Sequence, residues 1–192
     1  MSLKKIVSRT FQRFSRWKVV FGEPLPDKAV IIGAPHTSNW DGIFMLIALW
    51  DAGCDMKFLL KNSVINGPLG PIARAVGGVG VDRNSSNGLV ADIVEYAKKA
   101  DKFHLVIAPK GTRSRREYWK SGFYHIAREA GLPVVLGYID RDKMIYGWAH
   151  SIELTGDVRA DMDVIRKFYA GKKGMRPELS CEPRLRMEDD VN

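Results

Sequence analysis

Residues 29–50 read AVIIGAPHTSNWDGIFMLIALW, and the fold that we predict rests mainly on this pattern. Its first four residues are apolar, as in a buried strand, and its last eleven, from Trp40 onward, have the length and apolar character of a buried helix. The turn between them contains Thr37, Ser38 and Asn39, which are residue types that commonly cap helices. The stretch therefore predicts a strand, a short turn and a helix.

The same alternation continues along the chain. Strands are predicted at residues 29–32, 56–60, 79–81, 103–108 and 134–139, and helices at residues 40–52, 72–76, 89–97, 122–130 and 160–169. Residues 144–148 and 151–154 suggest a final pair of antiparallel strands. This alternation indicates an α/β protein whose mostly parallel sheet is flanked by helices. Ligands of such sheets bind beyond the carboxyl ends of the strands.

Three parts are expected along the chain. Residues 1–22 combine apolar positions near helical spacing with six basic residues, which is typical of an amphipathic helix at a lipid interface. A helix that packs its apolar side on the domain and leaves its basic side in water is the alternative. Residues 23–170 hold the α/β domain. Residues 171–192 are rich in charge and poor in apolar side chains, so we expect a loosely ordered tail.

His36 and Asp41 form the first candidate catalytic pair. A histidine beside a carboxylate can act as a general base that is held in one tautomer. Five residues correspond to a rotation of about 500° on an ideal helix. The two side chains therefore meet only if His36 lies in the turn before the helix and Asp41 lies in its first turn. Ser38 and Asp41 are also spaced as in a capping box, which is a purely structural alternative.

A basic, glycine-containing stretch follows another predicted strand. Residues 109–115 read PKGTRSR and come directly after the apolar run at residues 103–108. Arg113 is the strongest candidate for binding phosphate, because a guanidinium group can hold phosphate through two hydrogen bonds. A base at one strand end and a group of cations at another suggest chemistry on a phosphorylated hydroxyl compound.

The chain resembles the glycerolipid acyltransferase family in four sequence blocks that occur in the family's order. The blocks correspond here to His36-x4-Asp41, GGVGVDR at residues 77–83, PKGTRS at residues 109–114 and LPVVLGYI at residues 132–139. The resemblance covers about residues 28–140 and makes residues 23–170 an acyltransferase domain. It implies that His36 and Asp41 are catalytic. It also implies that the phosphate of the acceptor is bound by Arg83, Lys110, Gly111, Thr112 and Arg113.

The resemblance implies an O-acyltransferase similar to 1-acylglycerol-3-phosphate acyltransferases. Such an enzyme moves a fatty acyl group from acyl-CoA or acyl carrier protein to the hydroxyl of a glycerophosphate or a lysophospholipid. The thioester is a co-substrate, and we expect no other cofactor. The acyl chain needs an apolar groove, for which Phe44, Ile47 and Phe58 are candidates. The alternative, which is more common for such residues, is that they pack in the hydrophobic core.

Lys110 departs from the family, which usually has glutamate at this position. The change leaves the identity of the acceptor open, and a non-glycerol acceptor is one alternative. Lys110 could add a cation at the phosphate, pair with an acidic group of a different acceptor, or point into water.

Composition restricts the partners and the location. A net charge of +8 attracts nucleic acid or an anionic membrane, and the sequence has no nucleic-acid-binding signature, so we expect peripheral contact with a membrane. The four histidines form no metal-binding pattern, and the two cysteines suggest reduced thiols. We see no signal peptide, and the longest apolar run, residues 42–50, is too short to span a bilayer. We therefore expect a cytoplasmic protein at the inner face of the membrane.

Two other functions fit parts of this pattern. A non-enzymatic module that binds anionic lipids would need the basic residues but would not need His36. A hydrolase-like enzyme would use water in place of the alcohol acceptor.

Overall fold

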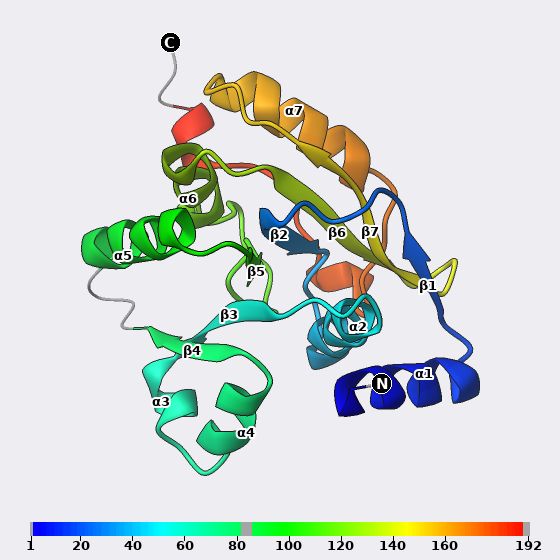
Figure 1. Cartoon of the computed structure of the whole chain (residues 1–192). Coiled ribbons are helices and arrows are strands. Elements are labelled where there is room, and N and C mark those ends of the chain that lie inside the picture. Colours follow the sequence, from blue (N-terminus) through cyan, green and yellow to red (C-terminus); the bar gives the residue numbers. More distant parts are fainter. Residues whose placement is uncertain (1, 82–85, 190–192) are drawn as a thin grey trace.

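The structure is a computed structural model that describes residues 2–81 and 86–189. A central sheet carries helices on both faces (Figure 1). In the described residues its strands are β1 (Lys18–Phe21), β2 (Lys28–Ala34), β3 (Met56–Lys61), β4 (Gly78–Val81), β5 (Phe103–Ile107), β6 (Val134–Asp140) and β7 (Ile145–Ile152). The α-helices are α1 (Leu3–Phe14), α2 (Asn39–Asp51), α3 (Asn62–Ile65), α4 (Gly70–Ala75), α5 (Ser86–Lys99), α6 (Gly122–Ala130) and α7 (Val158–Tyr169). Two short 3₁₀ turns follow, η1 (Pro177–Leu179) and η2 (Arg186–Glu188).

The sheet confirms the predicted fold class. Its strand order is β1-β7-β6-β2-β5-β3-β4, and β6 and β7 are its antiparallel pair, while the other neighbouring strands of the described chain run parallel. β2 lies at the centre between β6 and β5. Its alternate residues are buried on opposite faces, as the period of a strand requires. Val30 and Ile32 belong to one core, and Ala29 and Ile31 belong to the other.

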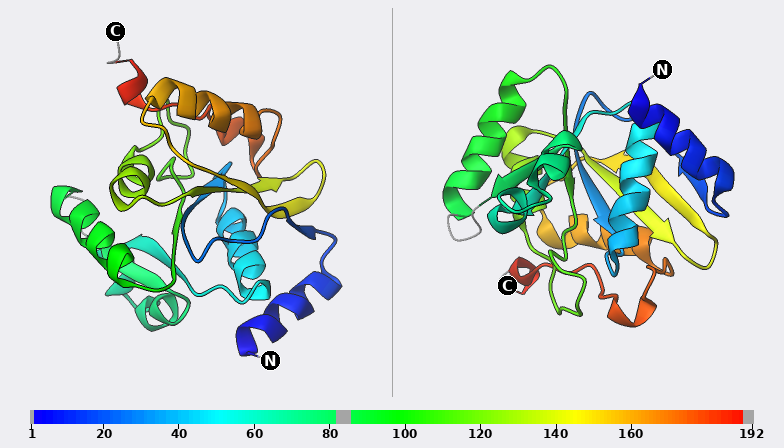
Figure 2. Two further views of the ribbon diagram at one scale, coloured as in Figure 1. Left: turned by 45° about the horizontal axis from the view of Figure 1, so that its top comes forward. Right: turned by 90° about the horizontal axis from the view of Figure 1, so that it is seen from below.

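Different helices cover the two faces of the sheet. The core that contains Val30 and Ile32 is closed by α5, α6 and α7, and the core that contains Ala29 and Ile31 is closed by α2 with α1 packed beside it (Figure 2). α2 begins at the carboxyl end of β2, so the turn between them is fixed by buried structure on both sides. None of the helices in the described part of the chain combines the length and apolar character that a bilayer crossing requires.

The N-terminal helix is shorter than expected. We predicted a helix over residues 1–22, whereas α1 ends at Phe14 and residues 18–21 form the edge strand β1. β1 pairs in parallel with β7, where Lys18 lies opposite Ile145. The basic and apolar pattern alone did not reveal this strand, because its partner lies more than 120 residues away in the sequence.

The pair of strands expected at residues 144–148 and 151–154 is one strand. β7 runs without interruption from Ile145 to Ile152 and pairs antiparallel with β6. The chain reverses before β7 rather than within it, at residues 141–144, where Met144 has a φ of 51°.

The C-terminal region differs from the loose order that we expected. Residues 171–189 pack along the domain, and Leu185 is fully buried in the core beside Trp119, with which it forms an isolated β-bridge. The few apolar residues of this region include anchors that enter the core.

Candidate active site

The two sequence motifs meet at one edge of the sheet. β2 ends at Ala34, shortly before His36, and β5 ends at Ile107, shortly before Lys110. The two strands are parallel neighbours in which Ile32 lies opposite Ile107. Because both motifs follow the carboxyl ends of adjacent strands, they lie where α/β proteins bind ligands.

His36 lies in the turn before α2, and Asp41 lies in the first turn of that helix. Asp41 is buried, and its Oδ2 accepts hydrogen bonds from the backbone N–H groups of Thr37 and of Ser38, the latter at 2.7 Å. The same oxygen lies 3.8 Å from Nδ1 of His36, which is too far for a hydrogen bond. Asp41 thus completes the capping box of α2 and also places a negative charge beside the imidazole.

One oxygen of Asp41 is still free to accept a hydrogen bond. Its Oδ1 is buried and has no hydrogen-bond partner among the described residues. A buried acceptor without a donor is energetically costly, and a protonated imidazole is a strong donor. Oδ2 of Asp41 therefore binds the backbone of the turn, while Oδ1 can accept a hydrogen bond from another donor such as a protonated imidazole.

The surroundings of His36 favour its neutral form. Burial lowers the pKa of the imidazole, the Asp41 carboxylate opposes this shift, and the cations Lys110 and Arg113 add to it, so that the pKa lies below its ordinary value. A neutral imidazole has a free lone pair. His36 is therefore in the protonation state that a general base requires.

Lys110 is buried, with only 2% of its surface exposed. Its Nζ donates hydrogen bonds to the backbone carbonyl of Leu179 at 2.7 Å and to that of Arg113 at 3.5 Å. Burial lowers the pKa of this ammonium group. The side chain does not point into water, which was one of our three expectations, and its hydrogen bonds go to the protein backbone.

The other residues of this motif form a tight turn. Gly111 has a φ of 68°, a conformation that favours glycine, and its N–H donates to the carbonyl of Ala108 at 2.8 Å. The Thr112 hydroxyl also accepts a hydrogen bond within the turn. Arg113 is exposed and donates to Oδ1 of Asn39 at the start of α2. Through its hydrogen bond to Asn39, Arg113 places a positive charge near the turn that contains His36.

Two cavities adjoin the motifs. The histidine cavity has a volume of about 200 Å³ and is lined by Gly33, Ala34, Pro35, His36, Pro109, Lys110, Trp119, Arg166, Tyr169, Ala170, Lys172, Ser180, Cys181, Glu182 and Pro183. The arginine pocket has a volume of about 260 Å³ and is lined by Thr37, Ser38, Asn39, Arg113, Ser114, Arg176 and Leu179. Consecutive residues of the first motif thus line both cavities.

One predicted residue cannot be located, and one lining residue was missed. Arg83 lies outside the described residues. Arg176 was not predicted, because it belongs to the region that we expected to be loosely ordered. Its backbone N–H donates to Oγ1 of Thr37 at 3.0 Å, which fixes it beside the first motif. No local pattern in the sequence reveals a contact between residues so far apart.

The residues proposed for an acyl groove lie in the core. Phe44 and Ile47 belong to α2 and are buried in the core between this helix and the sheet, and Phe58 of β3 packs against the same core. The Phe44 ring contacts that of Trp17, with centroids 4.4 Å apart. None of the three candidate groove residues lines the histidine cavity or the arginine pocket.

A histidine and a carboxylate in a strand–turn–helix motif, with an arginine on the neighbouring turn, define a site suited to acyl transfer. The model of the family described as Acyltransferase matches residues 16–138, more than half of the chain, so this protein belongs to the acyltransferase family.

Among solved structures, the chain is similar to the 1-acyl-sn-glycerophosphate acyltransferase PlsC from Thermotoga maritima. The two share 19% sequence identity and superpose with a TM-score of 0.57, over 80% of this chain and 70% of that chain. At this identity the likeness establishes a common fold. A comparison with curated proteins found no match.

Proposed function

We propose that the protein transfers a fatty acyl group from an acyl thioester to the hydroxyl of a glycerophosphate or a lysophospholipid, with His36 as the general base. The observation that carries the proposal is the position of His36, which lines a cavity at the carboxyl edge of the sheet with the Asp41 carboxylate 3.8 Å from its Nδ1. Membership in the acyltransferase family supports the reaction, and the acceptor named for the solved relative supports the choice of substrate.

In the proposed reaction, His36 removes the proton of the acceptor hydroxyl as its oxygen attacks the thioester carbonyl carbon. A C–O bond forms, the C–S bond breaks, and the imidazolium returns the proton to the leaving thiolate. The negative charge of Asp41 stabilises the imidazolium while it exists. Acyl-CoA or acyl carrier protein supplies the acyl group as a co-substrate, and the residues at the site need no other group.

The anionic end of the acceptor is assigned to the basic turn after β5. Arg113 offers a guanidinium group on the wall of the arginine pocket, and Gly111 and Thr112 shape the turn that presents it. Thr37 and Ser38 line the same pocket and directly follow His36 in the chain. We therefore assign the phosphate of the acceptor to Arg113 and its hydroxyl end to the adjoining cavity that His36 lines.

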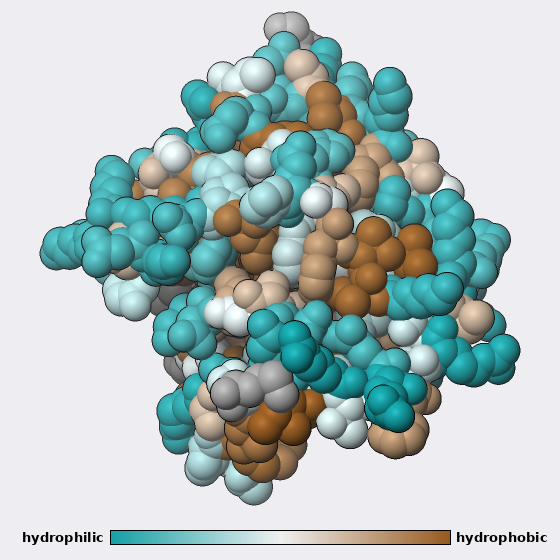
Figure 3. All heavy atoms as spheres, turned by 45° about the vertical axis from the view of Figure 1, so that its right-hand side comes forward, coloured by the Kyte–Doolittle hydropathy of each residue, from teal (hydrophilic) through white to brown (hydrophobic). Residues whose placement is uncertain are grey.

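Peripheral contact with an anionic membrane at the cytoplasmic face would bring the lipid substrate to this site. In α1, Phe11 packs against Phe44, whereas Leu3 and Phe14 are 75% and 81% exposed. Basic residues are interspersed along the same helix. On the side of the molecule that carries α1 and β1, apolar surface gathers in separate patches within a hydrophilic surround (Figure 3). This combination supports contact with lipid headgroups rather than deep insertion.

The rate of transfer is expected to depend on the protonation of His36. Only the neutral imidazole can accept a proton, so kcat/KM should rise with pH and reach a plateau above the pKa of His36. Because burial and nearby cations lower this pKa, the midpoint should fall below the ordinary histidine value of about 6.5. Arg113→Ala removes one of those cations and should move the midpoint to higher pH. A midpoint above the ordinary histidine value, or one that Arg113→Ala leaves unchanged, would argue against His36 as the base.

The proposal is tested by following thioester consumption with and without a hydroxyl acceptor. We expect acyl-CoA to be consumed rapidly only when glycerol 3-phosphate or lysophosphatidate is present, with the acylated acceptor as product. Equal consumption without acceptor would indicate a hydrolase. Vesicle binding with no consumption at all would indicate a lipid-binding module.

A further inference from the structure

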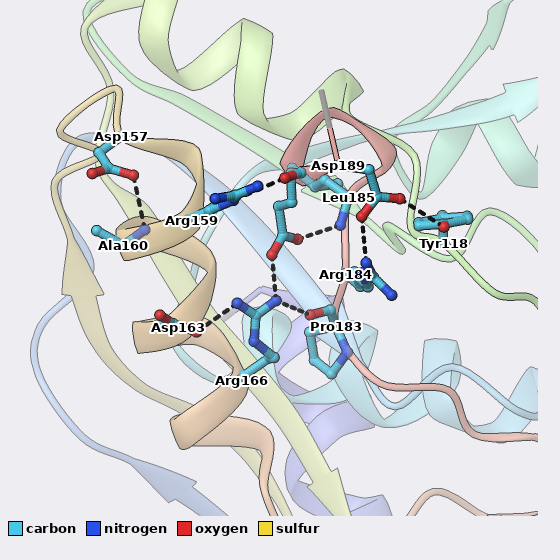
Figure 4. Close-up of polar contacts among 11 residues, drawn as sticks. Tyr118, Asp157, Arg159, Ala160, Asp163, Arg166, Pro183, Arg184, Leu185 and Asp189 are labelled. Carbon is cyan, nitrogen blue, oxygen red and sulfur yellow. Dashed lines mark hydrogen bonds and ion pairs between the residues drawn. The ribbon is translucent and has the colours of Figure 1, made fainter. Parts of the chain in front are cut away.

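Residues 174–189, which we call the C-terminal segment, are anchored to α7. Leu185 is fully buried, and the carboxylate of Glu188 accepts a hydrogen bond from Nη1 of Arg166 at 2.6 Å. The backbone carbonyl of Glu188 accepts a second hydrogen bond, from Nε of Arg159 at 2.9 Å. Figure 4 shows how these α7 side chains reach the segment. The segment is therefore a fixed part of the fold.

The first half of the C-terminal segment lies directly on both active-site motifs. A Cβ atom at Gly174 would lie only 2.6 Å from Oγ1 of Thr37, so the backbone approaches the His36 turn closely because residue 174 is glycine. The N–H of Arg176 binds the same hydroxyl oxygen. On the other motif, Lys110 donates to the carbonyl of Leu179 at 2.7 Å. These contacts fix the position of Arg176 relative to the site.

The C-terminal segment also contributes to both cavities. Arg176 and Leu179 line the arginine pocket, whereas the following residues, 180–183, line the histidine cavity. The segment thus supplies a wall to each of the two cavities next to His36. It lies beyond residues 16–138, which match the family model, so the family motifs do not include it.

The arginine pocket has the composition of an anion site. Arg113 and Arg176 both line it, and its lining contains no acidic residue. Within the described residues neither guanidinium forms an ion pair with a carboxylate, although Arg113 donates to the amide oxygen of Asn39. Ser38 and Ser114 add hydroxyl groups. Two arginine cations without a carboxylate partner, beside hydroxyl donors, match the oxygen atoms of a phosphate monoester.

We propose that Arg176 is a second phosphate-binding residue, which joins Arg113 in holding the phosphate monoester of the acceptor. This inference rests on the proposed function, because it assigns a role to the pocket next to the proposed base. Lys110 then acts as a positioning residue. Its buried ammonium group binds the carbonyl of Leu179 and so keeps Arg176 at the pocket, rather than binding phosphate itself.

The test is a calorimetric titration of the full-length protein with two phosphate monoesters, glycerol 3-phosphate and a short-chain lysophosphatidate. Arg176→Ala should weaken binding of the true acceptor about tenfold, which corresponds to about 1.4 kcal/mol. The backbone N–H that binds Thr37 is retained in this variant, so the segment should stay in position. The matched control is Arg186→Ala, which removes the same charge from an exposed residue of the same segment outside both cavities. This control should bind like the wild type.

Binding does not require turnover, so the inference can fail separately from the proposed function. Wild-type affinity in Arg176→Ala, an equal loss in Arg186→Ala, or no binding of either ester by the wild type would overturn the role of Arg176. Binding that depends on Arg176, in a protein that transfers no acyl group, would support the phosphate site and overturn the transferase. The pocket accepts the phosphate monoester whose affinity falls more in the Arg176→Ala variant.

Discussion

The His36→Ala variant is expected to lose acyl transfer by a factor of about 10² to 10⁴, the usual cost of removing a general base. The fold should survive, because the turn that carries His36 is held by the buried Asp41 through the backbone N–H groups of Thr37 and Ser38. The imidazole itself is only partly buried, with 23% of the side chain exposed. Steady-state kcat and a thermal melting curve, measured on the same preparation, test both halves of this prediction.

His125→Ala is the matched control for that experiment. His125 is an exposed residue of α6 and lines neither cavity, so its loss should leave kcat unchanged. If His36→Ala kept wild-type kcat with an unchanged melting curve, His36 would not be the base, and another group would have to remove the proton of the acceptor.

Lys110→Glu is expected to have the largest effect on stability. The substitution removes the hydrogen bond to Leu179 and places a carboxylate beside two backbone carbonyl oxygens at a position with 2% exposure. A buried charge that loses its partners typically costs about 2 to 4 kcal/mol, which for a chain of this length lowers the melting temperature by about 5 to 15 °C. Calorimetry measures the loss directly. Hydrogen exchange should also increase in residues 176–181, because the C-terminal segment loses its attachment to the site.

Lys57→Glu makes the same change of charge at an exposed position of β3 and controls for the change in net charge. It should melt close to the wild type. Equal melting temperatures for Lys110→Glu and the wild type would contradict the role of Lys110 as the anchor of the C-terminal segment. A shift in acceptor preference without loss of stability would instead indicate that Lys110 contacts the acceptor directly.

The sequence predicts well where a pattern is local. The apolar run before His36, the cap residues at the start of α2 and the run before residues 109–115 are continuous in the chain, so the two motifs and their positions at strand ends follow from short-range rules. The parallel pairing of β2 with β5 then brings the motifs together, as expected for an α/β sheet.

The sequence does not reveal features that depend on distant partners. β1 is only four residues long and forms because β7 lies beside it. The C-terminal segment has few apolar residues, yet Leu185 enters the core and Arg166 of α7 binds the neighbouring Glu188. Lys110 is the clearest example. A lysine is usually solvated, and nothing near it in the chain shows that its ammonium group is buried against the carbonyl of Leu179.

The role of His36 as the base in direct acyl transfer is tested by tracing the acyl group in a single turnover. Wild-type protein and His36→Ala are mixed with a labelled acyl thioester and a phosphorylated hydroxyl acceptor, and both protein and acceptor are analysed by mass spectrometry. Direct transfer with a histidine base predicts that the wild type labels the acceptor and that the protein itself is never labelled. In the His36→Ala reaction we expect label in neither the acceptor nor the protein. Labelled acceptor formed at the wild-type rate by His36→Ala, or an acylated protein that precedes the product, would contradict it.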